Sequence, residues 1–283
     1  MDRRMATTTT ATVGVAALAL LLAASPGAVR AQDTAPLIDG VGAYTHSQIM
    51  RHRGDEAATP TNKPGDKPAP NQRAGKRAAL GFDSLTFAPV PAVSKTLNAA
   101  FADSLTGRRP TLDHATLRGI DAEFVRNPRF RELLARQLGG DREQVLLALQ
   151  SGRLQAQFQR RLAGHGYSTR NLGDVVNAFM IYGWTLVNDG ARSDHGAAFA
   201  ALRQRLGDSL ARGEKMTTMD RADMQEAAEL YGLVATLAAA AWQNAGSPAE
   251  RASLRDGVNA IGRGIGIDFR RVALTERGFA PRR

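Results

Sequence analysis

Apolar side chains recur at helical spacing along the chain from Phe82 onward. The first run follows Pro89 and Pro91, which suit the entrance of a helix but not its interior. After these prolines, one face of the predicted helix carries Val93, Leu97, Phe101 and Leu105. This regular spacing predicts an amphipathic helix that packs through a single face.

Shorter helices are expected in the next stretch, because stop signals are frequent there. Asn127-Pro128 and Gly139-Gly140 each end an apolar run. Asp141 is placed to cap the following run, which continues to Gly164, and Ser151-Gly152 is a candidate break within it. The pattern therefore predicts several short helices in succession.

The C-terminal part of the chain predicts four more helices. The first, over residues 172 to 188, is apolar on much of its circumference, which favours a central position. A shorter helix follows from Asp194, and the longest covers residues 220 to 244. The last begins at Ser247-Pro248-Ala249-Glu250, a capping box with proline at the first helical position, and stops at Gly266.

The sequence predicts an all-α fold. No stretch of useful length alternates polar and apolar residues between turn signals, so a substantial sheet is not expected. No repeat of fixed period is evident, which argues against a solenoid. We therefore expect an irregular bundle of about seven or eight helices that follows a signal peptide and a disordered linker.

The N-terminal residues have the three parts of a secretory signal: the pair Arg3-Arg4, an apolar run from Val13 to Ala24, and small residues ending at Ala31. We expect residues 1–31 to be a signal peptide cleaved near Ala31, and the mature protein to be periplasmic or secreted. The apolar run is shorter than the roughly 20 residues of a membrane-spanning helix, so no permanent membrane anchor is expected. Arg3-Arg4 leaves the choice between the Sec and twin-arginine routes open.

Residues 32–80 are rich in Pro, Gly, Thr and mixed charge, and they bury too little apolar surface to offset the entropy of ordering them. We interpret them as a disordered linker that precedes a helical domain over residues 81–283. A small apolar island in this linker is a candidate to dock on the domain or on a partner. It consists of Leu37, Ile38, Val41, Tyr44, Ile49 and Met50.

The charge balance indicates the class of partner. The chain carries 37 Lys and Arg against 27 Asp and Glu, and it has no Cys, which excludes disulfides and thiolate chemistry. Its basic residues are spread through the chain without a nucleic-acid reader motif, so nucleic acid is not an expected partner. An anionic envelope polymer or another protein is the expected partner, and the sequence does not indicate the oligomeric state.

Several segments carry a family resemblance. They are Gly166-Tyr167, Asn171-Leu172-Gly173-Asp174, the aromatic run from Phe179 to Trp184, Gly266-Ile267-Asp268-Phe269, Leu274-Thr275 and Gly278-Phe279. Over most of residues 85 to 281 the chain resembles a family of uncharacterised exported bacterial proteins with an α-helical domain of unknown function. The stretch from Arg108 to Gly140 departs from that pattern. The resemblance implies a secreted α-helical domain and no known activity.

Motifs for catalysis, cofactors and metals are not evident. The sequence contains no nucleophile elbow, phosphate-binding loop or dinucleotide fingerprint. Neither His114 nor His195 has a second histidine three or four residues away, so a zinc site would need partners that are distant in sequence. We therefore assign no catalytic residue, metal ligand or cofactor.

These observations favour a non-enzymatic binding or structural protein of the cell envelope. The alternative is a peptidoglycan-cleaving or other envelope hydrolase that uses a glutamate as general acid. The candidate acids on predicted helices are Glu123, Glu132, Glu143, Glu226 and Glu229. None of them lies in a sequence that resembles a lysozyme or lytic-transglycosylase motif.

The aromatic run supplies the candidate ligand-binding residues, which are Asp174, Asn177, Tyr182 and Trp184. At about 100° per residue, Asp174, Asn177 and Trp184 share a broad helix face, on which a polar group beside an indole would line a groove. The other interpretation is that Trp184 packs helices together, with its N–H group satisfied inside the protein.

Overall fold

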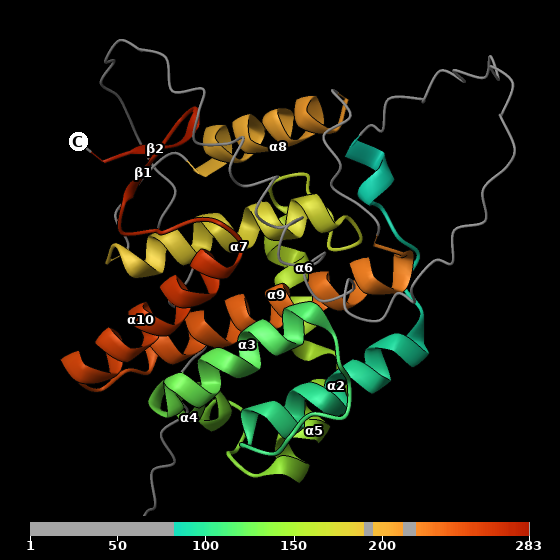
Figure 1. The fold of residues 1–283 in the computed structure, drawn as a ribbon, viewed down its shortest axis with the longest axis vertical. Coiled ribbons are helices and arrows are strands. Elements are labelled where there is room, and N and C mark those ends of the chain that lie inside the picture. Colours follow the sequence, from blue (N-terminus) through green and yellow to red (C-terminus); the bar gives the residue numbers. More distant parts are fainter. Residues whose placement is uncertain (1–81, 190–194, 212–218, 283) are drawn as a thin grey trace, which may run out of the picture. The chain divides into compact units, whose positions relative to one another are not determined.

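The computed structural model describes residues 82–189, 195–211 and 219–282. Within these ranges the fold is all-α, as predicted, with nine α-helices and one two-stranded hairpin (Figure 1). The predicted signal peptide (1–31), the predicted linker (32–80) and residue 81, where the helical domain is predicted to begin, lie outside the described residues.

A short 3₁₀ segment, η1 (Phe82–Leu85), comes first among the described elements. The helices that follow are α2 (Pro91–Leu105), α3 (Ala115–Arg126), α4 (Pro128–Arg136), α5 (Arg142–Gln150), α6 (Arg153–Ala163), α7 (Leu172–Val187), α8 (His195–Ala211), α9 (Arg221–Gln243) and α10 (Pro248–Gly264). The hairpin consists of β1 (Val272–Thr275) and β2 (Gly278–Pro281), which pair antiparallel in the register Val272 with Pro281.

The short helices end where the stop signals predict. The Asn127 side chain caps α4 by accepting a hydrogen bond from the Phe130 N–H at 3.0 Å. Asp141 caps α5 through the N–H groups of Glu143 and Gln144, both at 3.0 Å. Gly152 adopts a left-handed conformation with φ 68°, which favours glycine and separates α5 from α6. With this break the described residues contain nine helices, where the sequence predicted about seven or eight.

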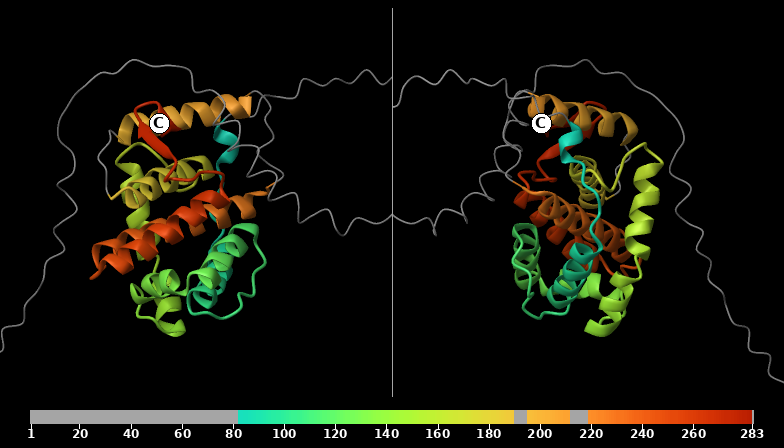
Figure 2. Two further views of the ribbon diagram at one scale, coloured as in Figure 1. Left: turned by 60° about the vertical axis from the view of Figure 1, so that its left-hand side comes forward. Right: turned by 90° about the vertical axis from the view of Figure 1, so that its right-hand side faces the viewer.

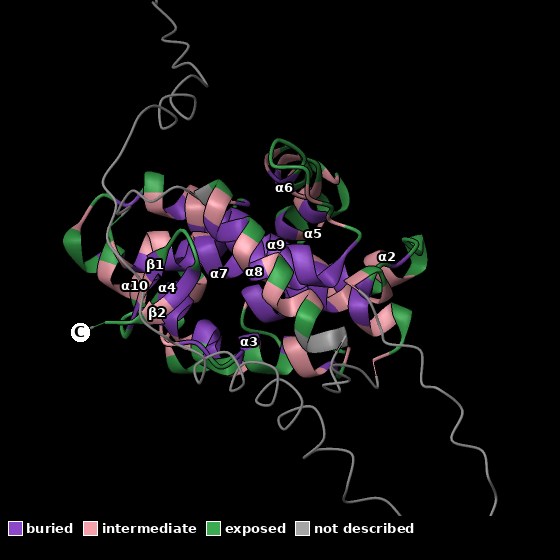
Figure 3. Ribbon diagram, turned by 90° about the horizontal axis from the view of Figure 1, so that it is seen from above, coloured by how far each residue is buried: buried purple, intermediate pink, exposed green. Residues whose placement is uncertain are grey.

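Helix α9 lies at the centre of the described helices. It packs against α2, α3, α4, α6, α7 and α10. Figure 1 shows it crossing the middle of the bundle, and in Figure 3 α9 and α7 carry much of the buried surface. Helix α7 packs on α8, α9 and α10, so the central position predicted for residues 172 to 188 is confirmed.

Helices α4 and α10 approach closely because one of them carries a glycine at the contact. A Cβ built at Gly257 of α10 would overlap the ring of Phe130, which projects from α4. Phe130 is fully buried and also lies 5.8 Å from Phe124 of α3, centroid to centroid. The absence of a side chain at Gly257 therefore sets the position of α4 on the bundle.

The C-terminal hairpin adds a feature that helical periodicity did not predict. Strand β2 packs against α8 (Figure 2). Gly278 has φ 91° at the turn, a conformation that glycine adopts without strain. No helix in the described ranges combines the length and apolar character of a membrane span.

Candidate functional site

The four predicted ligand-binding residues lie on α7, largely inside the bundle. Asp174, Asn177 and Trp184 are 1 %, 3 % and 5 % exposed, and Tyr182 is half-buried. The Trp184 Nε1–H donates a hydrogen bond to the Val272 carbonyl oxygen at 2.9 Å. This contact is typical of an indole that packs helices together. A binding role for the four residues stays a prediction.

Asp174 already forms an ion pair within the protein. Its Oδ2 accepts hydrogen bonds from the Ser168 N–H at 3.0 Å and from Arg203 Nη2 at 3.4 Å. Arg203 Nε also lies 3.0 Å from Oδ1, without the alignment of a hydrogen bond. Burial raises the pKa of Asp174, although Ser168 and Arg203 act in the opposite direction. The carboxyl group thus ties α7 to α8 through Arg203.

Three arginines of α4 line an open hollow of about 520 Å³. We call it the arginine hollow. Its lining consists of Leu105, Thr106, Arg129, Arg131, Glu132, Ala135, Arg136 and Gly140. Arg129 and Arg136 are two helical turns apart, which places them on one face of α4. Both side chains are 53 % exposed, so their guanidinium groups remain accessible to a ligand.

Glu250 neutralises part of the positive charge of Arg129 and Arg136. Its Oε1 accepts hydrogen bonds from Arg129 Nη2 at 2.9 Å and Arg136 Nη2 at 3.1 Å, and its Oε2 accepts the Gly246 N–H at 2.8 Å. The Gly246 N–H and the guanidinium of Arg136 hold the pKa of Glu250 below its ordinary value. Glu250 is therefore a stable anion that joins α4 to the start of α10.

Arg131 differs from the other two arginines because it has no ion pair among the described residues. Its guanidinium lies against the backbone at Gly107, where a Cβ would come within 2.8 Å of Arg131 Nη1. Glu132, the acidic residue of the lining, lies 3.7 Å from Arg129. The arginine hollow thus presents more positive than negative charge to solvent.

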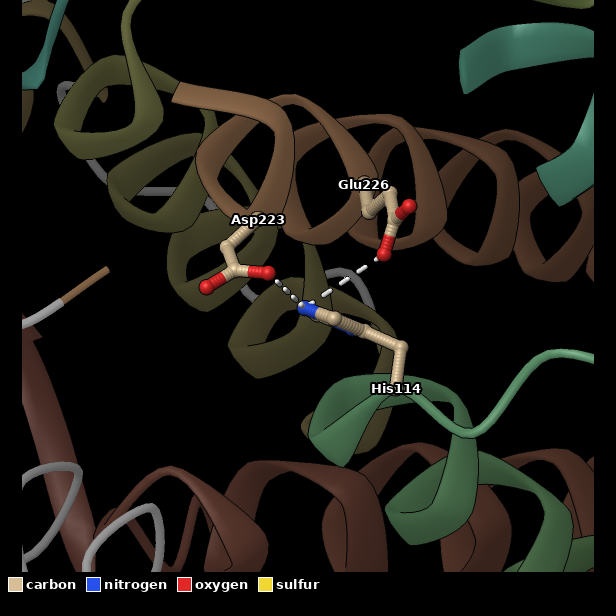
Figure 4. Close-up of side chains that lie close together, drawn as sticks. All are labelled: His114, Asp223 and Glu226. Carbon is tan, nitrogen blue, oxygen red and sulfur yellow. Dashed lines mark ion pairs between the residues drawn. The ribbon is translucent and has the colours of Figure 1, made fainter. Parts of the chain in front are cut away.

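A second charged site joins the start of α3 to the start of α9 (Figure 4). His114 is the N-cap residue of α3, and its Nδ1 accepts a hydrogen bond from the Thr116 N–H at 3.3 Å. Its Nε2 points toward α9, where it lies 4.0 Å from Asp223 Oδ1 and 3.7 Å from Glu226 Oε2. We call these three side chains the His114 cluster.

The electrostatics of the His114 cluster are dominated by burial and by negative charge. Burial raises the pKa of Glu226, and the nearby carboxylates of Asp223, Asp220 and Glu229 raise it further. Burial also lowers the pKa of His114, against the effect of Asp223. Among the described residues, neither Asp223 nor Glu226 has an arginine or lysine within ion-pair distance. A neutral imidazole therefore faces carboxylates that lack a cation.

The three side chains are also of the types that bind metal ions. Their potential ligand atoms all lie within 4.8 Å of one another, and no other group of His, Asp and Glu in the described ranges meets this condition. The spacing of Asp223 and Glu226, about one helical turn, is readable in the sequence. Their convergence on His114 is not, because helices α3 to α8 separate them in the chain.

No protein-family model, curated protein or solved structure matches the chain. The family resemblance stated above consequently stays a prediction. The local chemistry of the arginine hollow and the His114 cluster is therefore the basis for a functional proposal. Neither site was predicted from the sequence, although the three arginines that closely follow Pro128 are a local sign of the arginine hollow.

Proposed function

We propose that the protein is a non-enzymatic binding protein of the cell envelope, exported by its N-terminal signal, and that it binds an anionic envelope polymer at the arginine hollow. The observation that carries this proposal is that three arginines line one hollow and that Arg131, among the described residues, has no ion pair. Guanidinium groups bind phosphate and carboxylate through paired, charge-assisted hydrogen bonds.

The form of the hollow supports a polymer as the ligand. Its volume of about 520 Å³ is comparable to small-molecule pockets, but it is open to solvent, and half of its lining residues are charged. An extended anionic chain can lie across such a surface and contact several arginines at once. The net basic charge of the protein adds long-range attraction to a polyanion.

The hydrolase alternative requires an accessible glutamate that carries a proton. Burial raises the pKa of Glu123 and of Glu226 among the described glutamates. Neither residue lines the arginine hollow, and Glu226 faces His114. The binding proposal therefore predicts that the protein sediments with cell-wall sacculi and releases no soluble fragments.

Sedimentation with sacculi, measured over a series of NaCl concentrations, tests the proposal with two opposite charge changes. Arg131→Gln should weaken binding about tenfold, because a charged hydrogen-bond donor is lost. Glu132→Gln should strengthen binding, since it removes an acidic group from the same surface. Arg277→Gln, in the exposed hairpin turn, is the control and should bind as the unmodified protein does.

Binding that is independent of salt, or that Arg131→Gln and Arg277→Gln reduce equally, would contradict the role of the hollow. Fragment release that disappears in Glu226→Gln or Glu123→Gln would replace the proposal with the hydrolase alternative. Thermal unfolding of each variant shows whether the fold is retained, so a change in binding can be separated from a loss of structure.

A further inference from the structure

We propose that the His114 cluster binds one divalent transition-metal ion, with His114 Nε2, Asp223 and Glu226 as its protein ligands. The sequence assigned no metal ligand, because the two halves of this site lie on helices far apart in the chain. The proposal concerns a different surface from the arginine hollow and does not depend on it.

The first observation is the donor set itself. Imidazole nitrogen with two carboxylate oxygens is a ligand combination of zinc sites and of other transition-metal sites. Two carboxylates neutralise the double charge of the ion, and the neutral imidazole adds none. Among the described residues no arginine or lysine pairs with either carboxylate, so a bound cation would supply the missing positive charge.

The second, independent observation is the orientation of a ring nitrogen on a largely buried side chain. His114 is 8 % exposed, yet its Nε2 makes no hydrogen bond with the described residues. Nε2 instead points between the two carboxylates at distances of 3.7 and 4.0 Å, too long for hydrogen bonds (Figure 4). A largely buried imidazole that holds its free ring nitrogen toward two carboxylates points to a ligand between the three groups.

The distances fit an ion of this class. Around tetrahedral zinc, ligand atoms at about 2.0 to 2.2 Å from the metal lie about 3.3 to 3.6 Å from one another. The two separations from Nε2 exceed that range by only a few tenths of an ångström. Small side-chain rotations would close the site. Three protein ligands leave a fourth position for water.

The tautomer of His114 must change when the ion binds, and this gives the proposal a distinct signature. Because Nδ1 accepts the Thr116 N–H, the neutral ring carries its proton on Nε2 in the metal-free protein. A metal ion needs the lone pair of Nε2, so the proton moves to Nδ1 and the hydrogen bond from Thr116 is lost. The ion therefore exchanges one helix cap for three metal–ligand bonds.

The experiment uses the full chain without a polyhistidine tag, freed of metal with a chelator and titrated with Zn²⁺. We expect one ion per chain and a rise in Tm of about 5 to 10 °C when Zn²⁺ is in large excess over its Kd. The ¹⁵N chemical shifts of the His114 ring should report the proton on Nε2 before Zn²⁺ is added and on Nδ1 afterwards. Mg²⁺, which prefers oxygen ligands, should give a much smaller rise in Tm.

Three variants test the ligands. His114→Asn retains a good N-cap residue but removes the imidazole, and Asp223→Asn and Glu226→Gln remove one charge each with little change of shape. Each should weaken Zn²⁺ binding by more than about tenfold, the loss typical of removing even an outer-shell partner. His165→Asn, at an exposed histidine outside the cluster, is the matched control and should bind Zn²⁺ as the unmodified protein does.

Equal Zn²⁺ binding by the unmodified protein and by Glu226→Gln and Asp223→Asn would overturn the proposal. So would a His114 ring that keeps its proton on Nε2 in saturating Zn²⁺. If His114→Asn fails to fold, the two carboxylate variants and the ring shifts of the unmodified protein still decide the question. The metal-free protein should still sediment with sacculi, which would show that Zn²⁺ binding is independent of binding at the arginine hollow.

Discussion

Glu250, which pairs with two arginines of the arginine hollow, and Glu226 in the His114 cluster are glutamates near the start of long helices, and their surroundings are opposite. The Gly246 N–H, and after it Arg136 and Arg129, lower the pKa of Glu250, which accepts hydrogen bonds from all three. Burial, and after it the neighbouring carboxylates, raise the pKa of Glu226, which faces His114. The contrast shows that a glutamate can stabilise the contact between two helices where cations surround it, and can destabilise the fold where it lies among other carboxylates.

The largest expected effect comes from the packing beneath the arginine hollow. Gly257→Ala places a methyl group against the Phe130 ring, so α4 must shift or the ring must turn. We expect a loss of about 1 to 3 kcal/mol in the free energy of unfolding, measured by urea denaturation, because overpacking a dense core is destabilising. Binding to sacculi should weaken as well, since α4 carries the arginines, whereas Zn²⁺ binding should change little.

Gly264→Ala is the matched control for that variant. Gly264 lies on the same helix, and a Cβ built there meets nothing within 4 Å. Alanine has the higher helix propensity, so this variant should be as stable as the unmodified protein or more so. Equal destabilisation by both substitutions would show that the contact with Phe130 does not position α4.

The second-largest effect on stability is expected for Glu250→Gln. The substitution removes the charge that holds Arg129 and Arg136 together and weakens the bond to the Gly246 N–H. We expect a lower Tm at neutral pH, by a smaller amount than for Gly257→Ala. Glu132→Gln, at an exposed residue 3.7 Å from Arg129, should leave Tm nearly unchanged. A larger loss for Glu132→Gln would reverse the roles assigned to the two glutamates.

The smallest effect, and one of opposite sign, is expected for Glu226→Gln in the presence of a chelator. Removing this charge relieves repulsion with Asp220, Asp223 and Glu229, so Tm at neutral pH should rise slightly or stay the same. A clear loss of stability would show that the carboxylate of Glu226 has a favourable partner in the metal-free protein. In that case the contrast with Glu250 would fail.

The dependence of stability on pH separates the two glutamates further. The raised pKa of Glu226 means that the folded protein binds this proton more tightly than the unfolded chain, so its unfavourable contribution disappears as pH falls through that raised pKa, above 4.5. The lowered pKa of Glu250 has the opposite consequence. Its stabilisation is complete above 4.5 and is lost only as pH falls through the lower, folded pKa. Urea denaturation of the unmodified protein, Glu226→Gln and Glu250→Gln from neutral to acidic pH should show the pH range in which each glutamate changes the free energy of unfolding.

Local signals in the sequence predicted helix starts but neither of the two sites. The sequence Ser247-Pro248-Ala249-Glu250 predicted the start of α10, and the Ser247 side chain does accept the Glu250 N–H at 3.2 Å. The Glu250 carboxylate bonds to Gly246, one residue before the N-cap residue that a standard capping box would use. Its arginine partners are 121 and 114 residues away, a separation at which no periodicity or spacing carries information.

The same limit applies to the His114 cluster and to the helix count. Helical periodicity predicted α3 and α9, but their mutual orientation depends on the packing of the whole bundle. Gly152 was recognised as a candidate break, while its left-handed conformation depends on how α5 and α6 pack. The two strands at the C-terminus are four residues each, too short for an alternating pattern to be recognised.

The central position of α9 affects the order in which the protein can fold. Helices α2, α3, α4, α6 and α7 all precede α9 in the chain and all pack on it. During synthesis from the N-terminus, their apolar faces exist before their common partner does. The growing chain therefore lacks a closed core until Arg221–Gln243 has emerged, and until then it should depend on chaperones to avoid aggregation.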